Sequence, residues 1–77
     1  MKKVKIYTIK NSHQCHEAKK YFENQSIDFE EIDLTDDSRA TKDLVQKTGF
    51  TAVPQIEIGD KLIVGWDKKK VRELLED

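Results

Sequence analysis

The first patterned stretch of the chain alternates apolar and other residues near its beginning. Val4 and Ile6 share one face of an extended segment, while Tyr7 and Ile9 make the opposite face apolar towards its end. An alternation that becomes apolar on both faces is typical of an inner strand. The pattern therefore predicts a strand over residues 3–9 in the interior of a sheet.

Apolar residues then recur at the spacing of a helix. Either Asn11 or Ser12 can cap such a helix, and the Asn-Gln-Ser run that begins at Asn24 favours its end. We expect the polar residues between to face solvent and the apolar face to pack on the sheet. The members of that face are Cys15, Ala18 and Phe22.

The next apolar run, Ile27–Leu34, predicts a second strand, but its phase is inconsistent. Ile27 and Phe29 share one face of an extended segment, whereas Ile32 and Leu34 share the other. Either a bulge corrects the phase, or the strand proper begins after Phe29. The sequence leaves both possibilities open.

A second helix is predicted after the cluster Thr35–Ser38, whose short polar and acidic residues favour a helix start. Gly49 is the expected stop, because glycine readily adopts the left-handed conformation that ends helices. The inward positions of this helix are Ala40, Leu44, Val45 and Thr48.

The remaining sequence predicts a hairpin and a final helix. Two short runs, Gln55–Ile58 and Lys61–Val64, flank the turn Gly59-Asp60. Asp67 is the expected cap of the last helix. Its buried stripe is expected to hold Val71, Leu74 and Leu75.

The predicted order is therefore β-α-β-α-β-β-α. A right-handed crossover makes the first two strands parallel, and the hairpin adds an antiparallel pair. We expect a single α/β domain over residues 1–77, with a four-stranded mixed sheet flanked by helices.

Composition limits the classes of function. The formal net charge is −1 with 38% charged residues, which argues against a general nucleic-acid binder. No apolar run approaches the length of a membrane span, and a lone cysteine excludes an internal disulfide. We expect a cytoplasmic, monomeric protein without affinity for membranes or nucleic acids.

Several motifs, taken in order, resemble glutaredoxins. A strand leads into a C-x-x-C position at a helix start that ends with Cys15, Val53-Pro54 precedes a hairpin, and Gly65-Trp66-Asp67 precedes the last helix. The resemblance extends over residues 3–75 and is closest to the short bacterial glutaredoxin-like redoxins. It implies a thioredoxin-like fold. Some clostridial-type members of that group carry selenocysteine at the first active-site position.

The resemblance implies thiol–disulfide exchange, in which the residue at position 12 is the nucleophile and Cys15 resolves the mixed disulfide. The N-terminal end of a helix favours a thiolate there. This chain has Ser12 instead, as in Ser12-His13-Gln14-Cys15, and a hydroxyl cannot take part in reversible disulfide exchange. We therefore expect an impaired form of the enzyme. The simpler interpretations are a capping serine and a small buried cysteine.

Electrons would come from glutathione, as co-substrate, or from a thioredoxin reductase. Glutathione-using members often have T-V-P and G-G before the acidic residue. The sequences Ala52-Val53-Pro54 and Val64-Gly65-Trp66-Asp67 depart from both patterns. This departure leaves room for a thioredoxin-reductase-coupled type, and no bound cofactor is expected.

The resemblance also implies a substrate groove. The Val53–Pro54 bond is expected to be cis and to lie beside Ser12, so that the backbone of Val53 pairs with an incoming chain. Gly65, Trp66 and Asp67 would line the same groove. Lys10 could attract a substrate carboxylate or thiolate. Each of these assignments also has a simpler alternative. Pro54 would be an ordinary trans proline, Gly65-Trp66-Asp67 a turn with a packed Trp and a helix cap, and Lys10 a solvated lysine.

Two other functions are weighed against redox chemistry. One is a non-catalytic binding module that holds a partner through the Pro54 groove. The other is a metal site formed by His13, Cys15 and His16, for which two surface histidines are the simpler explanation. A Ser12–His13 hydrolase is disfavoured, because neighbours on a helix point about 100° apart.

Overall fold

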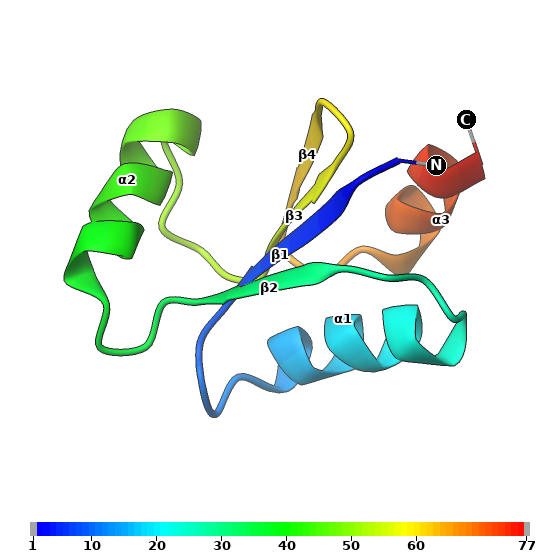
Figure 1. Ribbon diagram of the computed structural model, residues 1–77, viewed down its shortest axis with the longest axis horizontal. Coiled ribbons are helices and arrows are strands. Elements are labelled where there is room, and N and C mark those ends of the chain that lie inside the picture. The colour runs from blue at the N-terminus through cyan, green and yellow to red at the C-terminus, as the bar shows by residue number, and fades with distance from the viewer. Residues whose placement is uncertain (1, 77) are drawn as a thin grey trace.

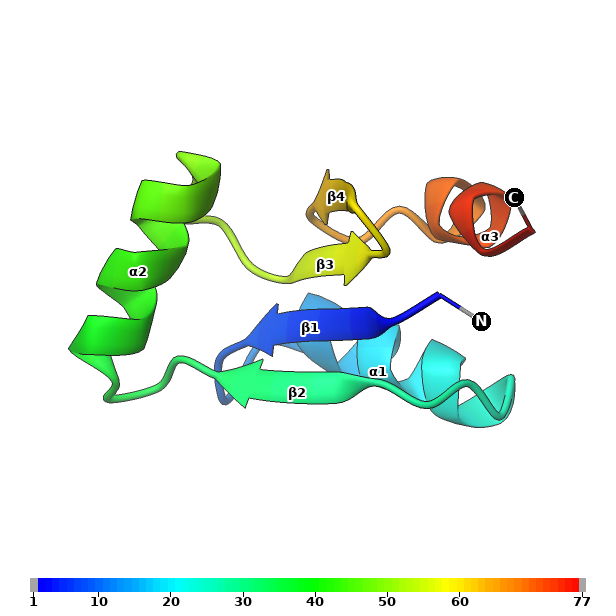
Figure 2. The same ribbon diagram turned by 45° about the horizontal axis from the view of Figure 1, so that its top comes forward.

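The computed structural model describes residues 2–76 and contains one mixed sheet with three helices (Figures 1 and 2). The strands lie in the order β2-β1-β3-β4. The β1–β2 pair is parallel and the β3–β4 pair is antiparallel, as predicted. The structure adds that β1 and β3 pair antiparallel. The elements are β1 (Val4–Thr8), α1 (His13–Asn24), β2 (Glu30–Asp33), α2 (Ser38–Thr48), β3 (Gln55–Ile58), β4 (Lys61–Val64) and α3 (Lys68–Glu76).

The main core lies on one face of the sheet, against α1 and α3. Ile6 of β1 is paired with Ile56 of β3, which is paired in turn with Ile63 of β4. Burying these apolar side chains together is the main source of stability in a domain of this size. The core cluster comprises Val4, Ile6, Ala18, Phe22, Ile56, Ile58, Ile63 and Val71.

Helix α2 lies apart from this core, beyond the ends of β1 and β2 (Figures 1 and 2). Of its predicted inward residues, Leu44 is buried, whereas Val45 and Thr48 are half-buried. The helix nevertheless begins and ends as predicted. Asp37 caps it by accepting the Ala40 N–H at 3.0 Å, and Gly49 ends it with φ 79°.

The second strand is shorter than predicted, because it begins at Glu30 and not at Ile27. The N–H of Ile27 donates to the Phe22 carbonyl at 2.9 Å, so this segment completes the end of α1. Ile27 and Phe29 still pack on the core, but outside the strand. The second of the two open possibilities, a strand that starts after Phe29, is therefore confirmed.

The first strand ends at Thr8, one residue before its predicted limit, and Ile9 is exposed. The choice between two helix caps is also settled. Asn11 adopts a left-handed turn with φ 63°, and Ser12 is the residue that caps α1. These two residues set the geometry of the candidate site.

Candidate functional site

The turn between β1 and α1 places position 12 at the N-terminal end of the helix. The Ser12 Oγ accepts the N–H of Cys15 at 3.2 Å, and the Ser12 carbonyl accepts the N–H of His16 at 3.1 Å. The turn is also held to the segment that follows β2, because the Lys10 N–H donates to the Thr35 Oγ1 at 2.7 Å. A group at position 12 therefore sits where backbone N–H groups and the helix dipole stabilise negative charge.

Around Ser12 the surface forms an open hollow of about 430 Å³. Cys15, with 1% of its surface exposed, contributes to its wall. The residues described around the hollow carry four basic or imidazole side chains and include no Asp or Glu, which suits an anion. They are Ile9, Lys10, Asn11, Ser12, His13, Cys15, His16 and Lys19.

The structure gives no support to a hydrolase site with Ser12 and His13, or to a metal site with His13, Cys15 and His16. His13 is 84% exposed and its Nε2 lies 3.4 Å from Glu17 Oε1, along the helix and not towards Ser12. A general base within reach of the serine is what a hydrolase would need. Within residues 2–76, no three or more His, Cys, Asp or Glu side chains gather in a group that could hold a metal ion.

The Val53–Pro54 bond is cis, which confirms the prediction, and Pro54 is buried. Its carbonyl accepts the N–H of Gly65 at 2.8 Å, so the two predicted groove segments are joined. Because Gln55 is paired with Tyr7, Pro54 and the turn that follows β1 lie at the same end of the sheet.

The buried side chain of Gln55 holds the loop before the proline. Its Nε2 donates to the carbonyls of Phe50 at 2.9 Å and Ala52 at 3.1 Å. Its Oε1 is buried without a hydrogen-bond partner among the described residues. Two loop carbonyls that would otherwise lack a side-chain donor are satisfied in this way, which fixes the loop.

Trp66 and Asp67 face other elements. The Trp66 ring lies 5.6 Å from the ring of Tyr21 on α1, and Asp67 Oδ1 accepts the Lys70 N–H at 3.1 Å as the predicted cap of α3. Neither lines the hollow around Ser12. The structure thus brings Lys10, Ser12 and Cys15 together and joins Gly65 to Pro54. Outside that hollow, Trp66 packs on Tyr21, and Asp67 is exposed at the start of α3.

A three-residue network beside the hollow was not predicted from the sequence. Glu31 Oε2 on β2 accepts the hydroxyl of Thr8 at 2.7 Å and the ammonium of Lys19 at 3.0 Å. The one available signal was that Lys19 lies one helical turn after Cys15. The strand residue that contacts Lys19 depends on the parallel register of β1 and β2, in which Glu31 is opposite Ile6.

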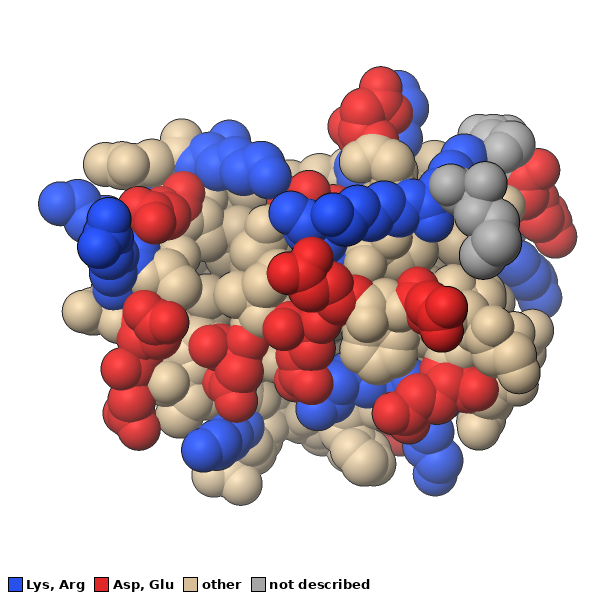
Figure 3. All heavy atoms as spheres, viewed as in Figure 1, with Lys and Arg blue, Asp and Glu red and all other residues tan. Residues whose placement is uncertain are grey.

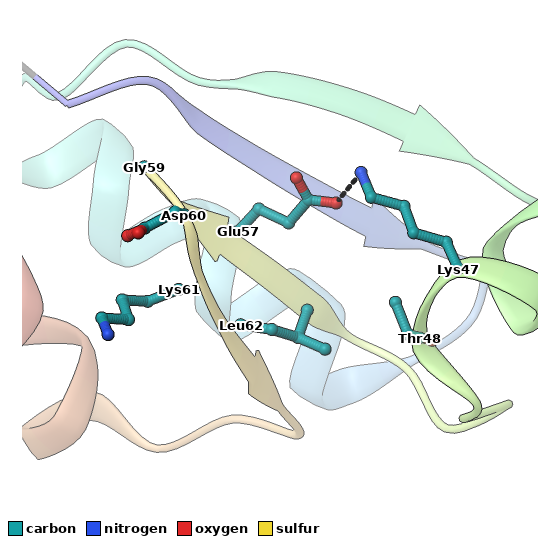
Figure 4. Close-up of a pocket in the computed structure, with 7 residues that line it drawn as sticks. All are labelled: Lys47, Thr48, Glu57, Gly59, Asp60, Lys61 and Leu62. Carbon is teal, nitrogen blue, oxygen red and sulfur yellow. Dashed lines mark hydrogen bonds and ion pairs between the residues drawn. The ribbon is translucent and has the colours of Figure 1, made fainter.

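A second unpredicted network ties α2 to the opposite face of the sheet. Glu57 Oε1 accepts the Lys47 ammonium at 2.8 Å and the Tyr7 hydroxyl at 2.9 Å. The pair Lys47–Glu57 spans one side of a hollow between α2 and the β3–β4 hairpin (Figure 4). Burial raises the pKa of Tyr7, and its bond to Glu57 raises it further.

Acid should weaken this second network. Burial by itself raises the pKa of Glu57, but the bonds from Lys47 and Tyr7 outweigh it, so the pKa lies below the ordinary 4.5. A carboxyl whose pKa is lowered by folding contributes stability above its unfolded pKa, and that contribution is lost as pH falls through the folded pKa. We expect the free energy of unfolding of the wild type to fall more steeply below about pH 4.5 than that of Glu57→Gln.

Urea unfolding followed by circular dichroism across the acid range measures this difference. Glu73→Gln, which changes an exposed carboxylate on α3, is the matched control and should follow the wild type. Parallel curves for the wild type and Glu57→Gln would show that the network does not stabilise the fold.

The charged residues do not form a basic surface over the face shown in Figure 3. Carboxylates gather along the β2 side, where residues 28–37 contain six Asp or Glu and no Lys or Arg. Nucleic-acid binding needs a continuous row of phosphate contacts. We expect no binding to a DNA duplex or a single-stranded RNA at physiological salt in a gel-shift assay; a shift that resists added salt would contradict this expectation.

The chain is similar to known proteins over most of its length. The sequence profile described as Glutaredoxin matches residues 4–63. The chain is 36% identical over 67 residues to a glutaredoxin of Pseudomonas aeruginosa, covering 87% of this chain and 80% of that protein. It is 29% identical over 73 residues to a glutaredoxin-like 8.6 kDa protein in the rubredoxin operon of Clostridium pasteurianum, covering 95% and 97%.

A solved structure shows the same architecture. NrdH-redoxin from Escherichia coli, described as a glutaredoxin-like protein with a thioredoxin-like activity profile, superposes with a TM-score of 0.80 at 29% identity. The match covers 94% of this chain and 93% of that one. None of the helices described over residues 2–76 is sufficiently long and apolar to span a membrane.

Proposed function

Since this chain belongs to the glutaredoxin family, we propose that it has the framework of a thiol–disulfide oxidoreductase whose nucleophile occupies position 12. The observation that carries the proposal is the geometry of Ser12, which caps α1 with its Oγ on the Cys15 N–H. A sulfur in place of that oxygen would meet the same donor and the same helix end.

The proposed reaction begins when a thiolate at position 12 attacks one sulfur of a disulfide. A mixed disulfide forms, and the other substrate sulfur leaves as a thiolate that takes a proton from solvent. The Cys15 thiolate then attacks the sulfur at position 12, which releases the second substrate thiol and leaves a disulfide between positions 12 and 15. Two electrons from glutathione or from a thioredoxin reductase restore the dithiol.

Ser12 breaks this cycle at its first step. A hydroxyl is a much weaker acid than a thiol and forms no stable bond to a substrate sulfur, so the form with Ser12 is impaired. We infer that the serine stands where cysteine, or the selenocysteine of some clostridial-type relatives, performs the chemistry. In the source gene, a cysteine codon at position 12 would identify the replaced residue as cysteine, and an in-frame stop codon there would identify it as selenocysteine.

Substrate contacts are assigned to the end of the sheet that holds the proline. In this proposal the Val53 backbone pairs with the substrate chain beside Pro54, Gly65 supports that loop through its bond to the Pro54 carbonyl, and Lys10 attracts a carboxylate or thiolate. Trp66 and Asp67 would contribute to the groove from its outer side. The lone cysteine and this reductive cycle suit a monomer in the reducing cytoplasm.

A binding module without chemistry is the second candidate, and Ser12 itself favours it. In that case the same groove would hold a partner chain through the Val53 backbone, and the exposed Ile9 and Phe50 at this end of the sheet would add apolar contacts. A native serine codon at position 12 would favour binding over lost catalysis.

The decisive experiment compares the chain with its Ser12→Cys variant in two coupled assays of disulfide reduction. One supplies glutathione with glutathione reductase, and the other supplies a thioredoxin reductase; NADPH consumption is the readout in both. Activity that appears with Ser12→Cys in either assay supports the proposal and identifies the electron donor. Inactivity of a folded Ser12→Cys variant in both would favour the binding module.

A further inference from the structure

Beside the hollow around Ser12, Lys19 is held in place by a carboxylate of the sheet. Its ammonium lies 3.0 Å from Glu31 Oε2, and both side chains are about two-thirds covered, at 32% and 34% exposure. Glu31 is fixed in turn by the hydroxyl of Thr8, a residue with 1% of its surface exposed. A lysine on a solvated helix face would have no such restraint.

Lys19 also belongs to the wall of the hollow. It lies one turn after Cys15 on α1, on the same face, and it lines the hollow together with Ser12. The carboxylate that holds it approaches from β2 and is not among the residues that line the hollow. Lys19 thus brings a positive charge to the wall of the hollow that also holds position 12.

We propose that Lys19 is an electrostatic component of the redox site, stabilising negative charge at position 12, and that Glu31 is the positioning residue that keeps it there. The proposal rests on the proposed function, because position 12 carries negative charge only as a thiolate. Other charged or titratable groups around the hollow are Lys10, His13 and His16, which line it, and Asp33 on β2, whose carboxylate interacts electrostatically with Lys10 and Lys19.

A one-thiol variant tests this without requiring turnover. In Ser12→Cys/Cys15→Ala, the rate of alkylation by iodoacetamide, a neutral reagent, reports the thiolate at position 12 across a pH series. Adding Lys19→Gln should slow alkylation by about two- to fivefold below the midpoint and move the midpoint to higher pH, as loss of a partly exposed charge would.

The matched control is Lys20→Gln, which removes the same charge one residue further along the helix. Lys20 lines a different hollow, with Tyr21 and Trp66, so its loss should leave the alkylation profile unchanged. Equal effects of the two substitutions would overturn the proposal, because they would reflect net charge alone. An alkylation profile that is unchanged in Lys19→Gln would also overturn the proposal.

The role of Glu31 is tested by a double-mutant cycle. Glu31→Gln retains an oxygen that can accept the Thr8 hydroxyl but loses the charge that holds Lys19. If Glu31 acts through Lys19, the midpoint shift caused by Glu31→Gln will differ between the Lys19 and Lys19→Gln backgrounds, being more upward when Lys19 is present. The same shift in both backgrounds would exclude the positioning role.

These outcomes are separable from failure of the proposed function. Alkylation needs a single thiol and no electron donor, whereas the coupled assays need both sulfurs. A Ser12→Cys variant that fails in the assays, yet shows the Lys19-dependent alkylation profile, would contradict the oxidoreductase cycle and leave the electrostatic role standing.

Discussion

Disulfide reduction by the Ser12→Cys variant is expected to exceed that of the chain with Ser12 by at least about a hundredfold, because a whole nucleophile is supplied. The rest of the site is already assembled. The Cys15 N–H points at the Oγ of residue 12, Cys15 lies one turn into α1, and the surrounding side chains provide positive charge. The measurement is the initial rate in the coupled assays.

Two variants control for effects other than the nucleophile. Ser12→Ala also lacks the serine oxygen and should stay inactive, which separates chemistry from the loss of a helix cap. Ser12→Cys/Cys15→Ala retains the nucleophile but lacks the resolving thiol, so it should form a mixed disulfide without completing the dithiol cycle. Comparable turnover by the chain with Ser12 would show that position 12 is not the nucleophile.

Truncating Phe22 is expected to have the largest effect on stability. Its side chain is fully buried in the core, and its ring lies 5.6 Å from that of Tyr21 and 5.9 Å from that of Phe29. Phe22→Ala should lower the free energy of unfolding by about 3–5 kcal/mol. A domain of this size has little more than that in total, so the variant should be partly unfolded at room temperature.

Phe50→Ala provides the matched control, since it makes the same change at a side chain that is 51% exposed. We expect it to alter the free energy of unfolding by less than about 0.5 kcal/mol. Urea titrations of both variants give the comparison. Similar losses at the two positions would mean that Phe22 is not a central core residue.

What could be predicted from the sequence was mainly what short-range chemistry decides. The cluster Thr35–Ser38, Gly49 and Asp67 were identified as helix boundaries, because residues of these kinds act on backbone groups within a few positions. The parallel first pair followed from the handedness of one crossover, and the antiparallel last pair followed from one hairpin turn. The limits of β2 did not follow, because the bond from Ile27 to Phe22 that excludes Ile27 from the sheet depends on how α1 ends.

In the candidate site, too, the residues that follow from local sequence were predicted and the long-range contacts were not. Ser12 and Cys15 were found because they occupy the two cysteine positions of the C-x-x-C motif, with two residues between them at the start of one helix. The contact of Lys19 with Glu31 depends on the register of β1 against β2, and the contact of Trp66 with Tyr21 depends on the docking of α3 beside α1. Strand register and helix docking are long-range features that the spacing of residues along the chain does not determine. These contacts could therefore be identified only from the folded structure.

The carboxylates along β2 have a consequence for how copies of the chain meet. β2 is an edge strand of the sheet, and it carries Glu30, Glu31 and Asp33 within its four residues. An open strand edge invites pairing with a neighbouring molecule, and rows of like charge oppose it. Two such edges brought together would repel each other, so this side of the sheet is protected against edge-to-edge aggregation even at high protein concentration.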